Sequence, residues 1–112
     1  MATLAIKLLG PFHVELDGKP LEDFRSDKVR GLLAFLSVES QRPWTRSYLA
    51  DLFWPDYPED NAQSNLSNAL WNLRSVIGDI QNGSMFVLVE KSTLQFNREA
   101  DYWLDAKSFV DM

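Results

Sequence analysis

The spacing of the hydrophobic residues changes twice along this chain, and this change constrains the fold more than any other feature. In residues 4–16 apolar and polar side chains alternate, which is typical of strands with one buried face. Between residues 26 and 78 the apolar side chains recur every three or four positions, as they do on helices. From residue 85 the alternation returns. The order strands, three helices, hairpin predicts an α+β domain.

The first part of the chain predicts a small antiparallel sheet. The alternating apolar residues are Leu4, Ile6 and Leu8 in the first strand, and Phe12, Val14 and Leu16 in the second. Gly10-Pro11 separates the two strands, and Asp17-Gly18 is a tight-turn signal. His13 falls on the polar face, where we expect an exposed strand histidine.

Cap and breaker residues set the expected bounds of the first two helices. Ser26 and Thr45 are suitable N-caps, and Pro55 ends the second helix by about Trp54. The apolar stripe of the first helix is Val29, Leu32, Leu33 and Leu36, and that of the second is Tyr48, Leu49, Leu52 and Phe53.

The third helix is expected to be long. Pro58, Glu59 and Asp60 suit its first turn, because proline lacks the donor that is unused there and acids favour the positive end of the dipole. Gly78 is a natural left-handed stop. The core stripe is Ala62, Leu66, Ala69, Leu70, Leu73 and Ile77.

The last part of the chain predicts a hairpin and the start of another element. Residues Met85–Glu90 and Thr93–Asn97 read as two strands that are joined near Lys91-Ser92. The tail "DYWLDAKSFVDM" is apolar-periodic and breaks off within its pattern. We expect it to be the first turn or two of a following element, so that the chain is a piece of a longer protein.

Composition excludes several classes of function. The 112 residues suffice for one small domain, and the absence of cysteine excludes disulfides and thiolate catalysis. One histidine cannot build the usual nitrogen and sulfur metal sites. There is no glycine-rich phosphate loop, signal peptide or membrane-spanning stretch. We therefore expect a soluble, cytoplasmic, non-enzymatic domain with no cofactor and no membrane partner.

Two helices that are joined by a short turn and followed by a hairpin form the winged helix-turn-helix layout. In this layout the second helix of the pair enters the major groove of DNA and the hairpin wing lies along the backbone. The same layout also occurs in modules that bind only protein. A protein-interaction module with Trp54 and Trp71 as anchors is therefore the alternative, and the net charge of −5 favours it.

The exposed face of the third helix favours DNA binding. The stretch Asn61–Ile77 contains no carboxylate, although ordinary surface helices carry several. Asparagine can pair with adenine through two hydrogen bonds, and serine allows close approach to base edges. The expected base-reading residues are Ser64, Asn65, Asn68, Trp71 and Asn72. The competing interpretation is an uncommitted polar surface on which Trp71 docks against a neighbouring domain.

Phosphate contacts need cations near this helix. Residues 24–78 hold six bases and six acids, so this segment is neutral although the whole chain is acidic. The expected phosphate contacts are Lys28, Arg30, Arg46, Arg74 and Lys91, of which Lys91 is weakened by the adjacent Glu90.

Four segments together resemble a known family. "LAIKLLGPFHVELDGKPL", "DKVRGLLAFL", "RPWTRSYLADLFWPD" and "LRSVIG" are similar, in this order, to the SARP class (antibiotic regulatory proteins) of bacterial transcriptional activators. The resemblance implies an OmpR-type winged-helix DNA-binding domain in residues 1–98. It also implies that residues 99–112 begin a helical bacterial transcriptional activation domain. For partners it implies promoter DNA with direct repeats, bound side by side as a homodimer.

The resemblance also suggests a role for the loop "WPDYPED". The corresponding loop of OmpR-type activators can touch RNA polymerase, which here implies a contact through Trp54, Asp56, Tyr57 and Glu59. The alternative is that the aromatic residues plug the core edge while the acids cap the third helix.

The chain departs from the family pattern at Gln63 and Asn72, where arginines are common. Either affinity for DNA comes from elsewhere in a longer protein, or this chain binds DNA weakly.

Overall fold

The computed structural model describes residues 3–82 and 86–106. The helices are α1 (Asp27–Val38), α2 (Arg46–Phe53), α3 (Glu59–Val76) and the short α4 (Asp79–Asn82). The strands are β1 (Leu4–Lys7), β2 (His13–Leu16), β3 (Lys19–Pro20), β4 (Trp44–Thr45), β5 (Val87–Val89), β6 (Thr93–Phe96) and β7 (Tyr102–Leu104). In the described residues they form a four-stranded sheet in the order β3-β2-β1-β7 and a three-stranded sheet in the order β4-β6-β5. The predicted α+β winged-helix layout is confirmed.

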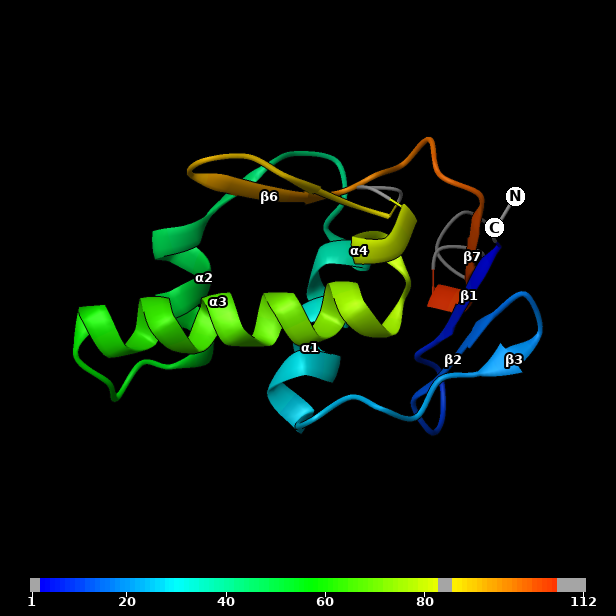
Figure 1. Ribbon diagram of the computed structural model, residues 1–112, viewed down its shortest axis with the longest axis horizontal. Helices are drawn as coiled ribbons and strands as arrows, with labels where there is room; N and C mark the ends of the chain where they lie inside the picture. The colour runs from blue at the N-terminus through cyan, green and yellow to red at the C-terminus, as the bar shows by residue number, and fades with distance from the viewer. Residues whose placement is uncertain (1–2, 83–85, 107–112) are drawn as a thin grey trace.

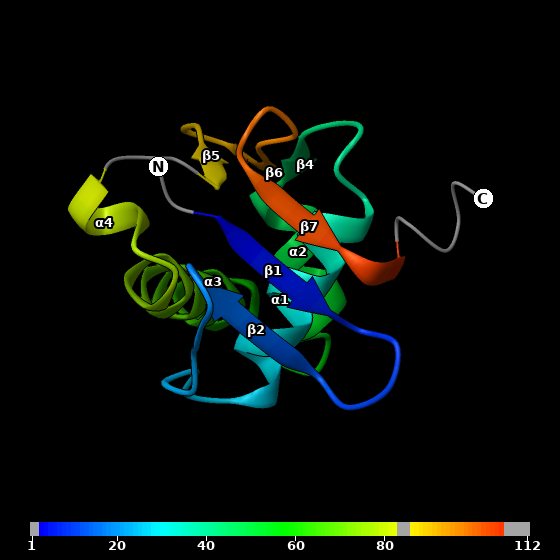
Figure 2. The same cartoon turned by 90° about the vertical axis from the view of Figure 1, so that its right-hand side faces the viewer.

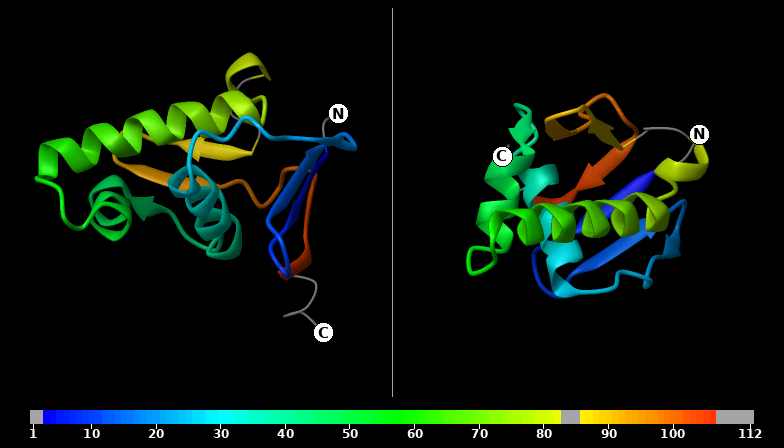
Figure 3. Two further views of the ribbon diagram at one scale, coloured as in Figure 1. Left: turned by 90° about the horizontal axis from the view of Figure 1, so that it is seen from below. Right: turned by 60° about the vertical axis from the view of Figure 1, so that its left-hand side comes forward.

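The N-terminal sheet stands at one end of the molecule and α2 lies at the other (Figures 1 and 3). Strands β1 and β2 are antiparallel, with Leu4 opposite Leu16 and Ile6 opposite Val14. Leu4, Ile6 and Val14 are buried, so one face of the sheet packs on the helices and the other faces outward. The positive φ angles of Asp17 and Gly18 form the predicted tight turn.

Strand β7 was not predicted as a strand. It pairs in parallel with β1 (Figure 2), with Leu4 opposite Tyr102 and Ile6 opposite Leu104. The folded unit therefore continues to at least Leu104, past the expected boundary at residue 98. A three-residue apolar segment cannot be stable alone, and here it completes the edge of β1. Residues 107–112, which belong to the expected following domain, lie outside the described residues.

The helix starts agree with the predicted caps. The hydroxyl oxygens of Ser26 and Thr45 accept hydrogen bonds from the amides of Val29 and Tyr48, at 3.4 and 3.1 Å. Such caps satisfy amide groups that have no partner within the helix. The backbone of Gly78 has φ +87°, as expected of a left-handed stop after α3.

The core lies between α3 and the two preceding helices, and α3 packs on both. Every residue of the predicted core stripe of α3 is buried, as is the stripe of α1. In α2 the prediction was wrong in part, because Tyr48 and Leu52 are exposed while Leu49 and Ala50 are buried. Phe53 is half-buried and packs against the core, whereas the short helix leaves Tyr48 and Leu52 outside its contact.

The wing is the hairpin of β5 and β6, and β4 adds a third strand to it. The hairpin begins and ends inside the predicted ranges, and Met85 lies outside the described residues. A helix both long enough and apolar enough to cross a membrane is absent from the described part of the chain.

Candidate nucleic-acid interface

The outward face of α3 presents short polar side chains and one tryptophan. Ser64, Asn68 and Trp71 are exposed, and 56% of Trp71 is accessible to solvent. Asn65 is half-buried beside them. The helix carries carboxylates only in its first turn, at Glu59 and Asp60, where they favour the positive end of the dipole. Four of the five predicted base-reading residues therefore lie where a DNA groove could reach them.

Asn72 is the exception. Its side chain is only 6% exposed, because the loop that precedes α1 covers it. Its Oδ1 accepts a hydrogen bond from the amide of Arg25 at 2.9 Å, and its Nδ2 donates to the carbonyl of Asp23 at 3.4 Å. The prediction that Asn72 reads a base was wrong, since the amide is already committed to this loop.

The wing borders one flank of α3 and is tied to the N-terminus of α2. The amide of Arg46 donates to the carbonyl of Ser92 at 2.9 Å, and its guanidinium reaches the carbonyl of Glu90 at 3.5 Å. Lys91, between these two carbonyls, is exposed at the tip of the hairpin. Arg46 therefore stabilises the position of the wing tip through these hydrogen bonds. Its half-buried guanidinium also places a positive charge beside the tip.

A buried carboxylate holds the base of the wing. Asp79 at the start of α4 is fully buried, and its two oxygens accept hydrogen bonds from the amides of Phe86 and Val87 at 3.0 and 2.8 Å. These bonds connect the end of α3 to the first residues of the hairpin. The wing and the helix are thereby held at a defined relative position.

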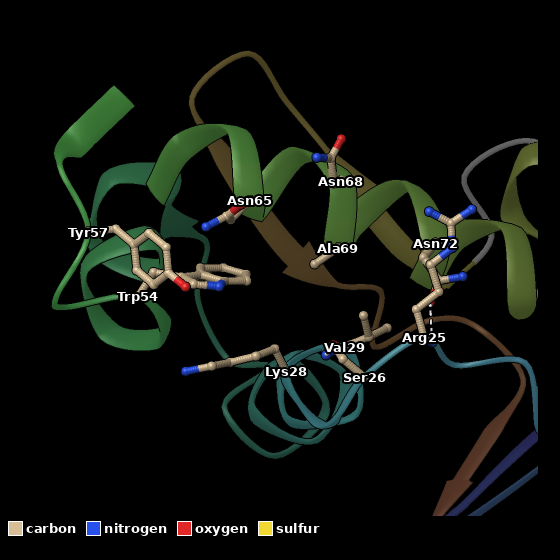
Figure 4. A pocket seen from close by; sticks show the side chains of 10 residues that line it. All are labelled: Arg25, Ser26, Lys28, Val29, Trp54, Tyr57, Asn65, Asn68, Ala69 and Asn72. Carbon is tan, nitrogen blue, oxygen red and sulfur yellow. Dashed lines mark hydrogen bonds between the residues drawn. The ribbon is translucent and has the colours of Figure 1, made fainter. Parts of the chain in front are cut away.

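A groove follows the other flank of α3, between that helix and the N-terminus of α1 (Figure 4). Its lining residues are Arg25, Ser26, Lys28, Val29, Trp54, Tyr57, Asn65, Asn68, Ala69 and Asn72. Two of the cations that line it lie over aromatic rings: Lys28 is 5.8 Å from the centre of the Trp54 ring, and Arg25 is 5.9 Å from that of Trp71, which lies outside the groove lining. Lys28 also donates to the carbonyl of Phe53.

Arg30 does not belong to this groove. Residues two positions apart on a helix point in nearly opposite directions, so Arg30 faces away from Lys28. Its guanidinium pairs with Asp27 at 2.8 Å and lines a hollow with Phe12 and His13 of the N-terminal part. The predicted phosphate contact of Arg30 is therefore not supported by its position. Arg74 is half-buried in the last turn of α3.

The loop between α2 and α3 was expected either to contact another protein or to plug the core edge, and its residues divide between these two roles. Trp54 is buried and packs on Phe53, with ring centres 6.1 Å apart, so it plugs the core edge and is not available as a polymerase contact. Asp56, Tyr57 and Glu59 are exposed. These three remain candidates for a protein contact.

Two groupings were missed from the sequence. Arg25 reaches the exposed face of α3 although it lies 47 residues from Asn72, the residue that binds its backbone. The second is a stack of Arg42, Trp44 and Tyr48, in which the guanidinium lies 3.9 Å from the Trp44 ring centre and the two rings are 5.2 Å apart. The first depends on tertiary packing, which no local signal predicts, whereas the second joins residues of the single stretch 42–48. A cluster of three or more residues suited to metal binding is absent from residues 3–82 and 86–106.

The comparisons with known proteins agree with this architecture. No family model matches the chain. Over 71 residues, 63% of the chain, the sequence is 31% identical to the transcriptional regulatory protein EmbR of Mycobacterium tuberculosis and of Mycobacterium bovis. In this region the chain is therefore similar in sequence to a transcriptional regulatory protein. It spans 18% of the length of these curated relatives.

The structural comparison shows the same fold. The structure of Mycobacterium tuberculosis EmbR in complex with a low-affinity phosphopeptide superposes with a TM-score of 0.70 at 23% identity. The match covers 87% of this chain and 26% of EmbR. The winged-helix fold that the two proteins share thus extends over most of this chain.

Proposed function

We propose that this SARP-type domain binds double-stranded DNA as part of a bacterial transcriptional regulator. In this proposal α3 enters the major groove, and Ser64, Asn65, Asn68 and Trp71 contact base edges. The wing and the N-terminus of α1 lie against the two flanking backbones. The observation that carries the proposal is the exposed, carboxylate-free face of α3 after its first turn.

The distribution of cations supports this orientation. Lys28 lies on one side of α3, while Arg46 and Lys91 lie on the other side at the wing, with Arg74 at the end of the helix. A DNA duplex in contact with α3 would meet phosphates on both sides, where these cations can bind them. The remaining acidity of the chain explains why we expect weak binding to non-specific DNA.

Exposed aromatic and apolar residues on α2 and in the loop that follows it favour a second contact, with protein. Tyr48, Leu52 and Tyr57 are each about half exposed, at 47%, 45% and 53%. We propose that this surface contacts RNA polymerase or a second copy of the domain on direct repeats. The alternative function is a winged helix that binds only protein, for which Trp71 would be an anchor.

Fluorescence anisotropy with a labelled mixed-sequence duplex tests DNA binding. Four phosphate contacts predict a loss of affinity of about 100-fold between about 50 and about 200 mM salt, because each contact releases about 0.9 counterion. Asn68→Glu should weaken binding by about tenfold or more, because it places a carboxylate against the DNA and removes a base contact.

A matched control separates the effect of position from that of net charge. Lys19→Gln changes the net charge by the same amount, but Lys19 is exposed on β3 at the edge of the N-terminal sheet. It should bind DNA nearly as the unmodified protein does. No binding of the unmodified protein at low salt would contradict the proposal, as would equal losses in the two variants.

A further inference from the structure

Helix α3, which enters the major groove in the proposed function, carries little positive charge. Arg74, in the last turn, is the only basic residue in the whole of α3. Any further cation near the exposed face must therefore come from a neighbouring element of the fold.

Arg25 is such a cation, delivered from the loop before α1. Its guanidinium carbon lies 5.9 Å from the centre of the Trp71 ring, a separation at which a cation and an aromatic face attract each other. Both side chains are exposed, so the guanidinium remains accessible at the edge of the groove. The close-up shows it beside Asn72, rising from the loop toward α3 (Figure 4).

The backbone that carries Arg25 is held on both sides. The buried amide of Asn72 accepts from the Arg25 amide at 2.9 Å and donates to the Asp23 carbonyl at 3.4 Å. The next residue, Ser26, caps α1. The buried amide of Asn72 bonds to this loop through both of its polar groups. It therefore fixes the path of the loop and the position of the Arg25 backbone, from which the side chain extends.

Three exposed acids, Glu22, Asp23 and Asp27, lie within three residues of Arg25 in the sequence, so the question is whether any of them pairs with it. Asp27, two residues on, is engaged by Arg30 at 2.8 Å. Within the described residues no carboxylate forms an ion pair with Arg25. A cation that is held in place without an acidic partner is suited to bind an anion from outside the domain.

We propose that Arg25 binds a DNA phosphate at the edge of the major groove beside Trp71, and that Asn72 is a positioning residue that holds Arg25 there. This inference rests on the proposed function. It explains how the domain can place a cation next to the exposed face of α3 although the helix itself carries no basic residue before Arg74. The buried asparagine supplies the charge indirectly, through the loop it holds.

Anisotropy titrations of Arg25→Gln over a range of salt concentrations test the contact. Loss of one phosphate contact predicts about tenfold weaker binding at low salt and a salt slope that is smaller by about 0.9. The loss should be the same for duplexes of different sequence, and Arg25→Lys should recover part of it. Arg98 is an exposed arginine in the turn between β6 and β7, and Arg98→Gln is the matched control. This variant should bind DNA nearly as the unmodified protein does.

A double-substitution cycle tests the role of Asn72. If Asn72 acts through Arg25, Asn72→Ala weakens binding in the unmodified background but adds nothing in the Arg25→Gln background. Thermal unfolding of each variant identifies any that fail to fold, and Arg25→Gln alone still tests the contact in that case.

The outcomes distinguish this inference from the function on which it rests. If the unmodified protein does not bind DNA, the proposed function fails. If it binds DNA and Arg25→Gln has the same affinity and salt slope, the inference fails alone. A loss that depends on the sequence of the duplex would also overturn it, because it would mean that Arg25 reads a base rather than a phosphate.

Discussion

Asp79→Asn should destabilise the domain by releasing the base of the wing. In the folded protein the Asp79 carboxylate is fully buried and accepts hydrogen bonds from the amides of Phe86 and Val87, at 3.0 and 2.8 Å. Asparagine has nearly the same shape but only one accepting oxygen. Its amide group would therefore face one backbone donor with another donor, and that buried N–H would lose its partner.

The magnitude follows from these two bonds. Hydrogen bonds to a charged group each contribute about 1.5–3 kcal/mol, and a buried donor without a partner costs about 1–3 kcal/mol. Because asparagine keeps one acceptor, we expect a loss of about 2–4 kcal/mol in the free energy of unfolding. For a domain of this size the melting temperature should fall by about 8–32 °C, at about 4–8 °C per kcal/mol.

Thermal and urea unfolding, followed by circular dichroism, measure this loss. Asp51→Asn is the matched control, because Asp51 is exposed on α2, and its melting temperature should change by less than about 3 °C. Amide hydrogen exchange should show faster exchange of Phe86 and Val87 in Asp79→Asn. A variant as stable as the Asp51→Asn control would refute the view that Asp79 anchors the wing.

Two further predictions concern stability away from the interface. Desolvation opposes the charge of Asp105, but hydrogen bonds from the amides of Leu8, Leu9 and Ala106 and the nearby charge of Lys7 outweigh it and lower the pKa of Asp105 below its usual value. Its contribution to stability is therefore fully present above about pH 4, the unfolded pKa, and is lost as the pH falls through the folded pKa. In urea unfolding between about pH 6 and about pH 3, Asp105→Asn should show a weaker pH dependence than the unmodified protein, and identical pH profiles would contradict this. Leu66→Ala should lower the free energy of unfolding by about 2–5 kcal/mol, because Leu66 is fully buried in α3. Ser67→Ala, on the exposed side of the same helix, should leave it nearly unchanged. Similar losses for both variants would mean that α3 does not pack as described.

The sequence predicted those parts of the fold that depend on local signals. The caps at Ser26 and Thr45 and the buried stripe of α3 are confirmed, because each depends on residues within one or two turns of the helix. The exposure of Ser64 and Asn68 followed from the same periodicity.

The parts that failed depend on contacts between distant residues. Asn72 lies on the polar side of its helix, but a loop 47 residues away folds over it and binds its amide. Trp54 is buried, and the sequence left this open as one of two interpretations of its loop. The pairing of β7 with β1 joins segments at opposite ends of the chain. Periodicity carries no information about such partners.

The same reason explains why Arg25 was overlooked and Arg30 was overvalued. Both are single arginines near the start of α1, and the sequence does not indicate which one faces α3. In the structure Arg25 lies over Trp71, while Arg30 turns toward Asp27 and the N-terminal sheet.

An amide NMR titration of this domain with a mixed-sequence duplex at low salt, repeated at higher salt, tests the central claim most directly. We predict shifts concentrated on Ser64 to Trp71, on Arg25 and at the wing tip around Lys91, which fade as the salt concentration rises. No shifts at low salt, or shifts confined to the N-terminal sheet, would contradict DNA binding through α3.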